Sequence, residues 1–273
     1  MVEARLRPCG PYSLKLTTWT TEWRADLREG RWAEARQLPD GTVVVRASCE
    51  VAVEEARFLL ALDDDTSEFH REFARDPLLG ASVRSLRGLR PPRRATIAHA
   101  VVQAVCGQLV QSRRARQIER AVLRACGETP PSREALARLS PAALTACGLA
   151  PSRAATLARL VRTIDLDALR STPDTALLRL GRERGIGPWS VGVIALHGLG
   201  RYDAGLVGDL GLVKLLAARG GAWPEPAQTA EFLQPYGKWQ GLASVFLLAG
   251  VKRGLVSGAS ADRARLARAR WAA

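Results

Sequence analysis

The chain has 273 residues, of which 47% are hydrophobic, and it carries 40 Lys and Arg residues against 27 Asp and Glu residues. This hydrophobic fraction is ordinary for a globular protein and excludes a mainly disordered chain. The apolar runs, such as residues 191–196, are far shorter than the ~20 residues that span a bilayer, so we expect no membrane segment. The first residues lack the apolar core of a secretory signal, and we therefore expect a cytoplasmic protein.

The cysteines give no sign of a disulfide or metal framework. There are five of them, an odd number, and none forms a C-x-x-C pair. This spacing argues against disulfides, a zinc site or an iron–sulfur centre, and favours a reducing compartment. We expect no metal held by side chains and no organic cofactor.

The net charge of +13 points towards a polyanionic partner. A bias in codon usage is the alternative source, because nearly all the basic residues are arginine; the lysines are Lys15, Lys214, Lys238 and Lys252. The distribution of the charge is therefore more informative than its sum.

The first part of the chain combines strand and helix patterns. Residues 12–18 and 42–47 alternate or are β-branched and predict strands, and the Pro39-Asp40-Gly41 turn precedes the second. Residues 51–62 and 67–74 predict helices. We expect an N-terminal domain of mixed α/β structure over residues 1–85.

A basic, proline-containing break at residues 87–94 precedes a region dominated by helical periodicity. The fold class expected is therefore α+β, with a mostly α-helical region over residues 86–273 in two subdomains, one covering about residues 95–235. The helices expected in this region cover residues 96–110, 113–126, 133–139, 141–146, 152–164, 174–180, 189–196, 210–218 and 261–270.

The sequence Gly185-Ile186-Gly187-Pro188 lies between two of these helices. Two glycines around one aliphatic residue predict a tight turn with Ile186 in the core, and proline suits the first turn of the next helix. The free N–H groups of such a turn can bind a phosphate. An ordinary corner between helices is the alternative, since this short pattern is common.

Asp209 raises the specificity of the pattern. It lies between Gly208 and Leu210, 22 positions after Gly187, and follows an apolar helix and a short loop. This placement predicts a helix N-cap at the edge of a cleft. Capping alone would also explain the residue, and the two roles are compatible.

Together these motifs resemble the helix–hairpin–helix DNA glycosylase superfamily, and specifically its DNA-3-methyladenine glycosylase II branch. The segments that carry the resemblance are GIGPWSVG and GDLGLVK, with further similarity at residues 105–110, at residues 148–154 and in the helix at residues 235–248. The resemblance implies base excision repair, in which a damaged base is flipped out of the duplex and its glycosidic bond is hydrolysed.

The resemblance also assigns roles to residues. Asp209 would be the catalytic carboxylate, acting on an oxocarbenium-like sugar or on a water. The lysine nucleophile of strand-cutting members is replaced by Trp189, which implies a monofunctional enzyme. The other roles implied are a base pocket of Trp189, Val193, Tyr236 and Trp239, a DNA wedge of Gln108 and Leu109, and phosphate binding by Gly185, Ile186 and Gly187 beside Arg182 and Arg184.

The pocket departs from the family pattern, because Val193 stands where an aromatic residue is frequent and Gly237 replaces an arginine. The expected substrates are 3-methyladenine and 7-methylguanine types in double-stranded DNA, and the expected state is a monomer. The hairpin carbonyls could also hold a monovalent cation, as they do in the family. Three alternatives remain: a non-catalytic DNA-binding protein, a glycosylase for deaminated bases, and a basic RNA-binding protein.

Overall fold

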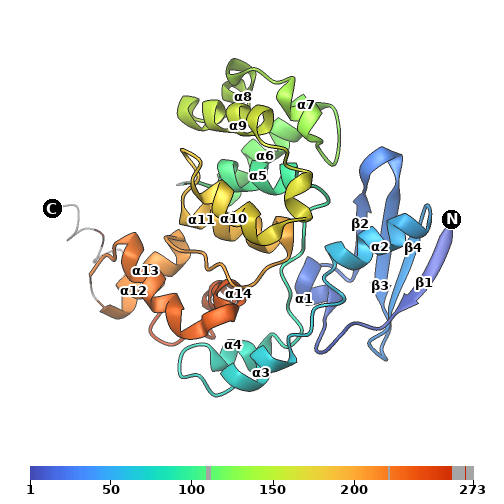
Figure 1. Cartoon of the computed structure of the whole chain (residues 1–273). Coiled ribbons are helices and arrows are strands. Elements are labelled where there is room, and N and C mark those ends of the chain that lie inside the picture. Colours follow the sequence, from blue (N-terminus) through green and yellow to red (C-terminus); the bar gives the residue numbers. More distant parts are fainter. Residues whose placement is uncertain (109–111, 221, 260–267, 269–273) are drawn as a thin grey trace.

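The computed structural model describes residues 1–108, 112–220, 222–259 and 268. A small sheet domain lies on one side of a larger helical body, with α2 against the sheet (Figure 1). The predicted α+β class is confirmed, and so is the mostly helical character of the larger part. No helix in the described part of the chain is long and apolar enough to cross a membrane.

The sheet has four antiparallel strands in the order β1-β4-β3-β2. Their bounds are Val2–Leu6 for β1, Glu22–Asp26 for β2, Trp32–Gln37 for β3 and Val43–Ala47 for β4. β4 confirms the strand predicted at residues 42–47, and its valines are buried in the centre of the sheet. Helix α2, Glu50–Leu59, packs on β3 and β4 and confirms the first predicted helix.

The strand predicted at residues 12–18 is wrong, because Leu14–Thr18 forms helix α1. The side chain of Ser13 accepts a hydrogen bond from the Leu16 N–H at 3.3 Å. This N-cap and the burial of Leu14 and Thr17 outweigh the β propensity of the threonines.

Two separate cores divide the molecule earlier in the chain than residue 85. The core of the sheet domain contains buried residues between Leu14 and Leu62. Helices α3, Ser67–Phe73, and α4, Gly80–Ser85, contribute instead to the core of the helical body, where α4 packs on α14. The segment predicted as the end of the first domain thus packs as part of the second.

The helical body is built around α5, Ile97–Gly107, which is buried along most of its length and packs on α6, α9 and α11. Its other helices are α6 (Ser112–Cys126), α7 (Arg133–Ala137), α8 (Pro141–Ala146), α9 (Pro151–Thr163), α10 (Pro173–Gly181), α11 (Pro188–Ile194), α12 (Leu210–Gly220), α13 (Pro226–Leu233) and α14 (Gln240–Lys252). A π-helical turn, Ala195–Leu199, extends α11. The helix predicted at residues 261–270 lies largely outside the described residues.

Arginines join the sheet domain to the helical body. The fully buried Arg90 donates to the carbonyls of Cys9, Pro11 and Ala61, so it ties three segments together. The guanidinium carbons of Arg93 and Arg170 both lie over the ring of Phe58, at 4.5 and 4.6 Å from its centre. These contacts fix the sheet domain beside the helices.

Candidate active site

The hairpin between α10 and α11 has the geometry that the sequence predicts. Ile186 is buried, whereas Gly185 and Gly187 are exposed, and Gly187 precedes Pro188 at the start of α11. Gly185 has a φ of 87°, and a Cβ there would lie 2.5 Å from Oγ1 of Thr156. Only glycine fits this position without strain. The turn therefore presents its backbone at the surface and its aliphatic side chain to the core.

Two side chains from elsewhere in the helical body donate hydrogen bonds to the carbonyls of the hairpin. Nη2 of Arg159, on α9, donates to the carbonyl of Arg184 at 2.6 Å, and its Nη1 pairs with Glu183. The amide of Gln108 donates to the carbonyl of Gly185 at 2.8 Å and to Oγ of Ser190 at 2.9 Å. The structure thus connects the end of α5 to the hairpin through a residue that the resemblance assigns to the wedge. Leu109, its predicted partner, lies outside the described residues.

Asp209 faces the start of α11 and also caps α12. Its Oδ1 accepts the N–H of Gly211 at 2.7 Å, and its Oδ2 accepts the indole N–H of Trp189 at 2.9 Å. The carboxylate is therefore fixed at both oxygens, and the side chain remains half-buried rather than enclosed. The capping role predicted for Asp209 is present, and Trp189 lies next to it.

Gly107 makes room for the Trp189 ring. A Cβ at Gly107, the last residue of α5, would lie 2.5 Å from Cη2 of Trp189. The Trp189 ring is therefore held by two contacts. One edge of the ring lies against α5, and the indole N–H is hydrogen-bonded to Asp209. This contact and those of Arg159 and Ser190 are not predictable from the sequence pattern; the small residue before Gln108 is the only local indication of the contact with Trp189.

The other predicted pocket residues are packed in the core. Tyr236 and Trp239 are 6% and 8% exposed, and Val193 is 5% exposed. Tyr236 contacts Phe73 and Phe232, and Trp239 contacts Phe69 and Tyr202. Burial raises the pKa of Tyr236 to about 12. These contacts give all three residues a packing role, and the structure groups only Trp189 with Asp209.

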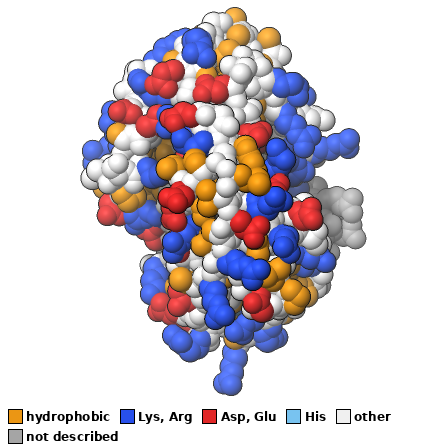
Figure 2. All heavy atoms as spheres, turned by 90° about the vertical axis from the view of Figure 1, so that its right-hand side faces the viewer, with side chains coloured by type: hydrophobic (Ala, Val, Ile, Leu, Met, Phe, Trp, Pro, Cys, Tyr) orange, Lys and Arg blue, Asp and Glu red, His pale blue; other side chains and the backbone are white. Residues whose placement is uncertain are grey.

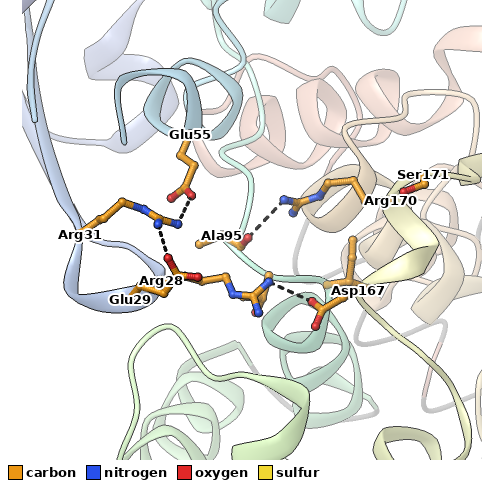
Figure 3. A pocket seen from close by; sticks show the side chains of 10 residues that line it. Arg28, Glu29, Arg31, Glu55, Ala95, Asp167, Arg170 and Ser171 are labelled. Atoms are coloured by element: carbon orange, nitrogen blue, oxygen red, sulfur yellow. Dashed lines mark hydrogen bonds and ion pairs between the residues drawn. The ribbon is translucent and has the colours of Figure 1, made fainter. Parts of the chain in front are cut away.

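A cavity of about 440 Å³ lies elsewhere, at the junction of the two domains. Its wall contains Arg28 paired with Asp167 at 3.4 Å, Arg31 paired with Glu55 at 2.7 Å, and Arg170 (Figure 3). The charged groups that line it thus largely neutralise one another. Neither Trp189 nor Asp209 contributes to this wall.

The arginines of the molecule differ in whether an ion pair neutralises them. Many arginines of the sheet domain form ion pairs, as Arg24, Arg28, Arg31, Arg46 and Arg57 do. Basic and acidic side chains are accordingly mixed over the face of the molecule that Figure 2 shows, which is the right-hand side of Figure 1. Arg182 and Arg184 beside the hairpin are exposed and form no ion pair within the described residues. The hairpin thus carries positive charge that no ion pair within the described residues neutralises.

Similarity to solved structures confirms the fold. The 3-methyladenine DNA-glycosylase from Archaeoglobus fulgidus aligns with 92% of this chain and 98% of its own, with a TM-score of 0.79 at 17% identity. The 8-oxoguanine glycosylase/lyase of Clostridium acetobutylicum, bound to double-stranded DNA, aligns with 90% and 93%, with a TM-score of 0.70 at 17% identity. The chain has the fold of these DNA glycosylases, which is the fold that the sequence resemblance implies.

Among proteins compared by sequence, the chain is similar to the probable bifunctional transcriptional activator/DNA repair enzyme AlkA of Mycobacterium tuberculosis. The two are 29% identical over 246 residues, covering 79% of this chain and 48% of the relative. The chain thus spans about half the length of the curated relatives it matches. No protein-family model matches the chain.

Proposed function

We propose that the protein is a monofunctional DNA glycosylase that excises alkylated bases from duplex DNA in base excision repair. One observation carries this proposal: the Asp209 carboxylate, fixed by Gly211 and Trp189, stands half-exposed 22 positions after a surface hairpin. The AlkA relative, named as a DNA repair enzyme, supports a role in DNA repair, and the structure named as a 3-methyladenine DNA-glycosylase supports alkylated bases as the substrate class.

The hairpin is proposed to bind the DNA backbone. The exposed glycines allow a phosphate to approach the main chain closely, and Arg182 and Arg184 add charge on the same turn. Binding there would hold the strand while the damaged nucleotide rotates towards Asp209, because a stacked base leaves its glycosidic bond inaccessible.

Asp209 is proposed to act on the sugar of the flipped nucleotide. As the C1′–N bond breaks, its electron pair leaves with the cationic base, which departs neutral, and positive charge develops on the sugar. A carboxylate at that position stabilises this charge. A water then forms the new C1′–O bond and releases its proton, either to Asp209 or to solvent. Both roles use the same carboxylate geometry.

Trp189 supports a water-using mechanism without a protein nucleophile. It occupies the position of the lysine in strand-cutting relatives, and no lysine occurs between Lys15 and Lys214. An amine that could form a Schiff base is therefore missing from the hairpin and from the start of α11.

The proposed preference for cationic bases rests on the pairing of Trp189 with Asp209. An aromatic ring and a carboxylate side by side both attract a positive charge. N3- and N7-alkylated purines carry such a charge and are also good leaving groups. Val193, Tyr236 and Trp239 are buried in the core. The proposed preference for cationic bases therefore rests mainly on Trp189 and Asp209, and less on these three residues.

The proposal further includes damaged double-stranded DNA as partner, a monomeric state, a cytoplasmic location and no cofactor. The proposal also keeps a site for a monovalent cation at the hairpin carbonyls, since Glu183, Arg184 and Gly185 each accept one hydrogen bond within the protein and retain a second lone pair. The proposed reaction does not use this ion.

The test is to incubate the protein with methylated duplex DNA under multiple turnover and to identify the released bases chromatographically. Release of 3-methyladenine or 7-methylguanine is expected. A protein that binds the duplex but releases nothing would be a non-catalytic binding protein, and selective release of hypoxanthine or uracil from matched duplexes would mark a deaminated-base enzyme. Tight binding to RNA without base release would support the third alternative.

A further inference from the structure

Helix α6 carries a row of arginines along its outer face. They are Arg113, Arg116, Arg120 and Arg124, and all four are exposed. At about 100° per residue, this spacing confines the four side chains to a sector of roughly 80°. The opposite face is buried through Ile118, Val122 and Cys126, so the four arginines lie on the side of the helix away from the core.

These four residues, called here the α6 arginine stripe, form no ion pairs within the described parts of the chain. By contrast, Glu119, the acidic residue of the same helix, points inwards to His99 at 3.1 Å and Arg94 at 3.0 Å. The stripe therefore keeps four unneutralised charges over about 16 Å of helix, at a rise of ~1.5 Å per residue.

The start of the stripe is close in the chain to a residue that contacts the hairpin. Gln108, which is hydrogen-bonded to Gly185 and Ser190, precedes Arg113 by five residues in the chain. Five residues span at most ~18 Å, so the first turn of α6 lies within that distance of the hairpin contact. The guanidinium of Arg114 lies against Gly148 of the turn between α8 and α9. A DNA duplex bound at the hairpin is long enough to reach the first turns of α6.

We propose that the α6 arginine stripe binds the phosphate backbone of a DNA duplex and enlarges the contact made by the hairpin. This inference rests on the proposed function for the identity of the partner. Duplex DNA carries one negative charge per ~1.7 Å of its axis, so several phosphates fall within the length of the stripe. Exposed guanidinium groups suit them because each can donate two hydrogen bonds to a phosphate.

The test compares three variants for binding to an undamaged duplex of about 20 base pairs across a salt series. The stripe variant combines Arg113→Ala, Arg116→Ala and Arg120→Ala. A control removes the same charge from exposed arginines of the sheet domain, by Arg5→Ala, Arg7→Ala and Arg36→Ala. A hairpin variant combines Arg182→Ala and Arg184→Ala, and circular dichroism verifies that all three are folded.

The stripe variant is expected to bind at least about tenfold more weakly than wild type near 0.1 M salt, with a slope of log K against log salt shallower by up to ~2.7 for three lost contacts. The control should remain within about twofold. Equal behaviour of stripe and control variants would overturn the inference, as would a stripe effect seen on duplex RNA but absent on DNA.

The hairpin variant separates this inference from the proposed function. Loss of binding in the hairpin variant with a wild-type salt slope in the stripe variant would leave the proposed function standing and reject the stripe. Wild-type protein that fails to bind the duplex would reject both.

Discussion

Replacing Trp189 with phenylalanine tests whether the indole N–H positions Asp209. The substitution keeps an aromatic ring but removes the donor that lies 2.9 Å from Oδ2. Hydrogen bonds to charged groups contribute ~1.5–3 kcal/mol, and the half-buried setting favours the lower value. Each 1.36 kcal/mol of lost transition-state stabilisation slows a reaction about tenfold. Base release should therefore slow about tenfold.

Single-turnover release from a methylated duplex measures this step apart from binding. The dissociation constant for undamaged duplex should stay within about twofold of wild type, because the hairpin is unchanged. A release rate within twofold of wild type, or a faster one, would show that the hydrogen bond does not position the carboxylate.

Gly107→Ala provides a second approach to the same contact. Its methyl group would displace the Trp189 ring, since the new Cβ would lie 2.5 Å from Cη2. The change should slow base release in wild type but have little further effect in Trp189→Phe, whose ring lacks that atom. Gly220→Ala is the matched control, because Gly220 also ends a helix and has nothing within 4 Å of its added Cβ. If Gly107→Ala and Trp189→Phe slowed base release additively, the two residues would not act through the same contact.

Three further predictions concern the mechanism and the stability. Borohydride should trap no covalent adduct with damaged DNA, because Trp189 stands at the lysine position; a trapped adduct would refute the monofunctional mechanism. Burial lowers the pKa of His70 to about 4, so the unfolded chain binds a proton between pH 6.5 and 4 that the folded state excludes. Stability should hence fall by ~2 kcal/mol between pH 7 and pH 5 from this group, and urea denaturation of His70→Phe should show a smaller fall. Arg90→Met should cost about 3 kcal/mol or more in the same assay, since it leaves three carbonyls without their donor; a loss below 1 kcal/mol would contradict the bracing role.

The sequence predicts the helical body better than the sheet. Long amphipathic patterns such as that of α6, with Ile118, Val122 and Cys126 at intervals of four, identify helices directly. Strands β1, β2 and β3 are not evident from the sequence because they combine charged residues with alanine, and β1 and β2 contain no fully buried residue. β1 and β3 pair with the valines of β4, and β2 pairs with β3; this pairing stabilises the strands and is not visible in local sequence.

The same difference applies to the candidate site. The hairpin and Asp209 were predictable, because glycine, proline and a capping carboxylate have local signatures. The Trp189–Asp209 hydrogen bond and the support from Arg159 were not, since they join residues 20 and 25 positions apart through tertiary packing. Tyr236 and Trp239 are the opposite case: the sequence predicts them in the base pocket, but the structure packs them against α3.

The most direct test of the central claim is the single-turnover release of 3-methyladenine by wild type and Asp209→Asn. The variant keeps the side-chain shape but loses the negative charge, so release should fall by at least about a hundredfold while affinity for the duplex stays within a few-fold. Release by Asp209→Asn within a few-fold of wild type would contradict the assignment of Asp209 as the catalytic carboxylate.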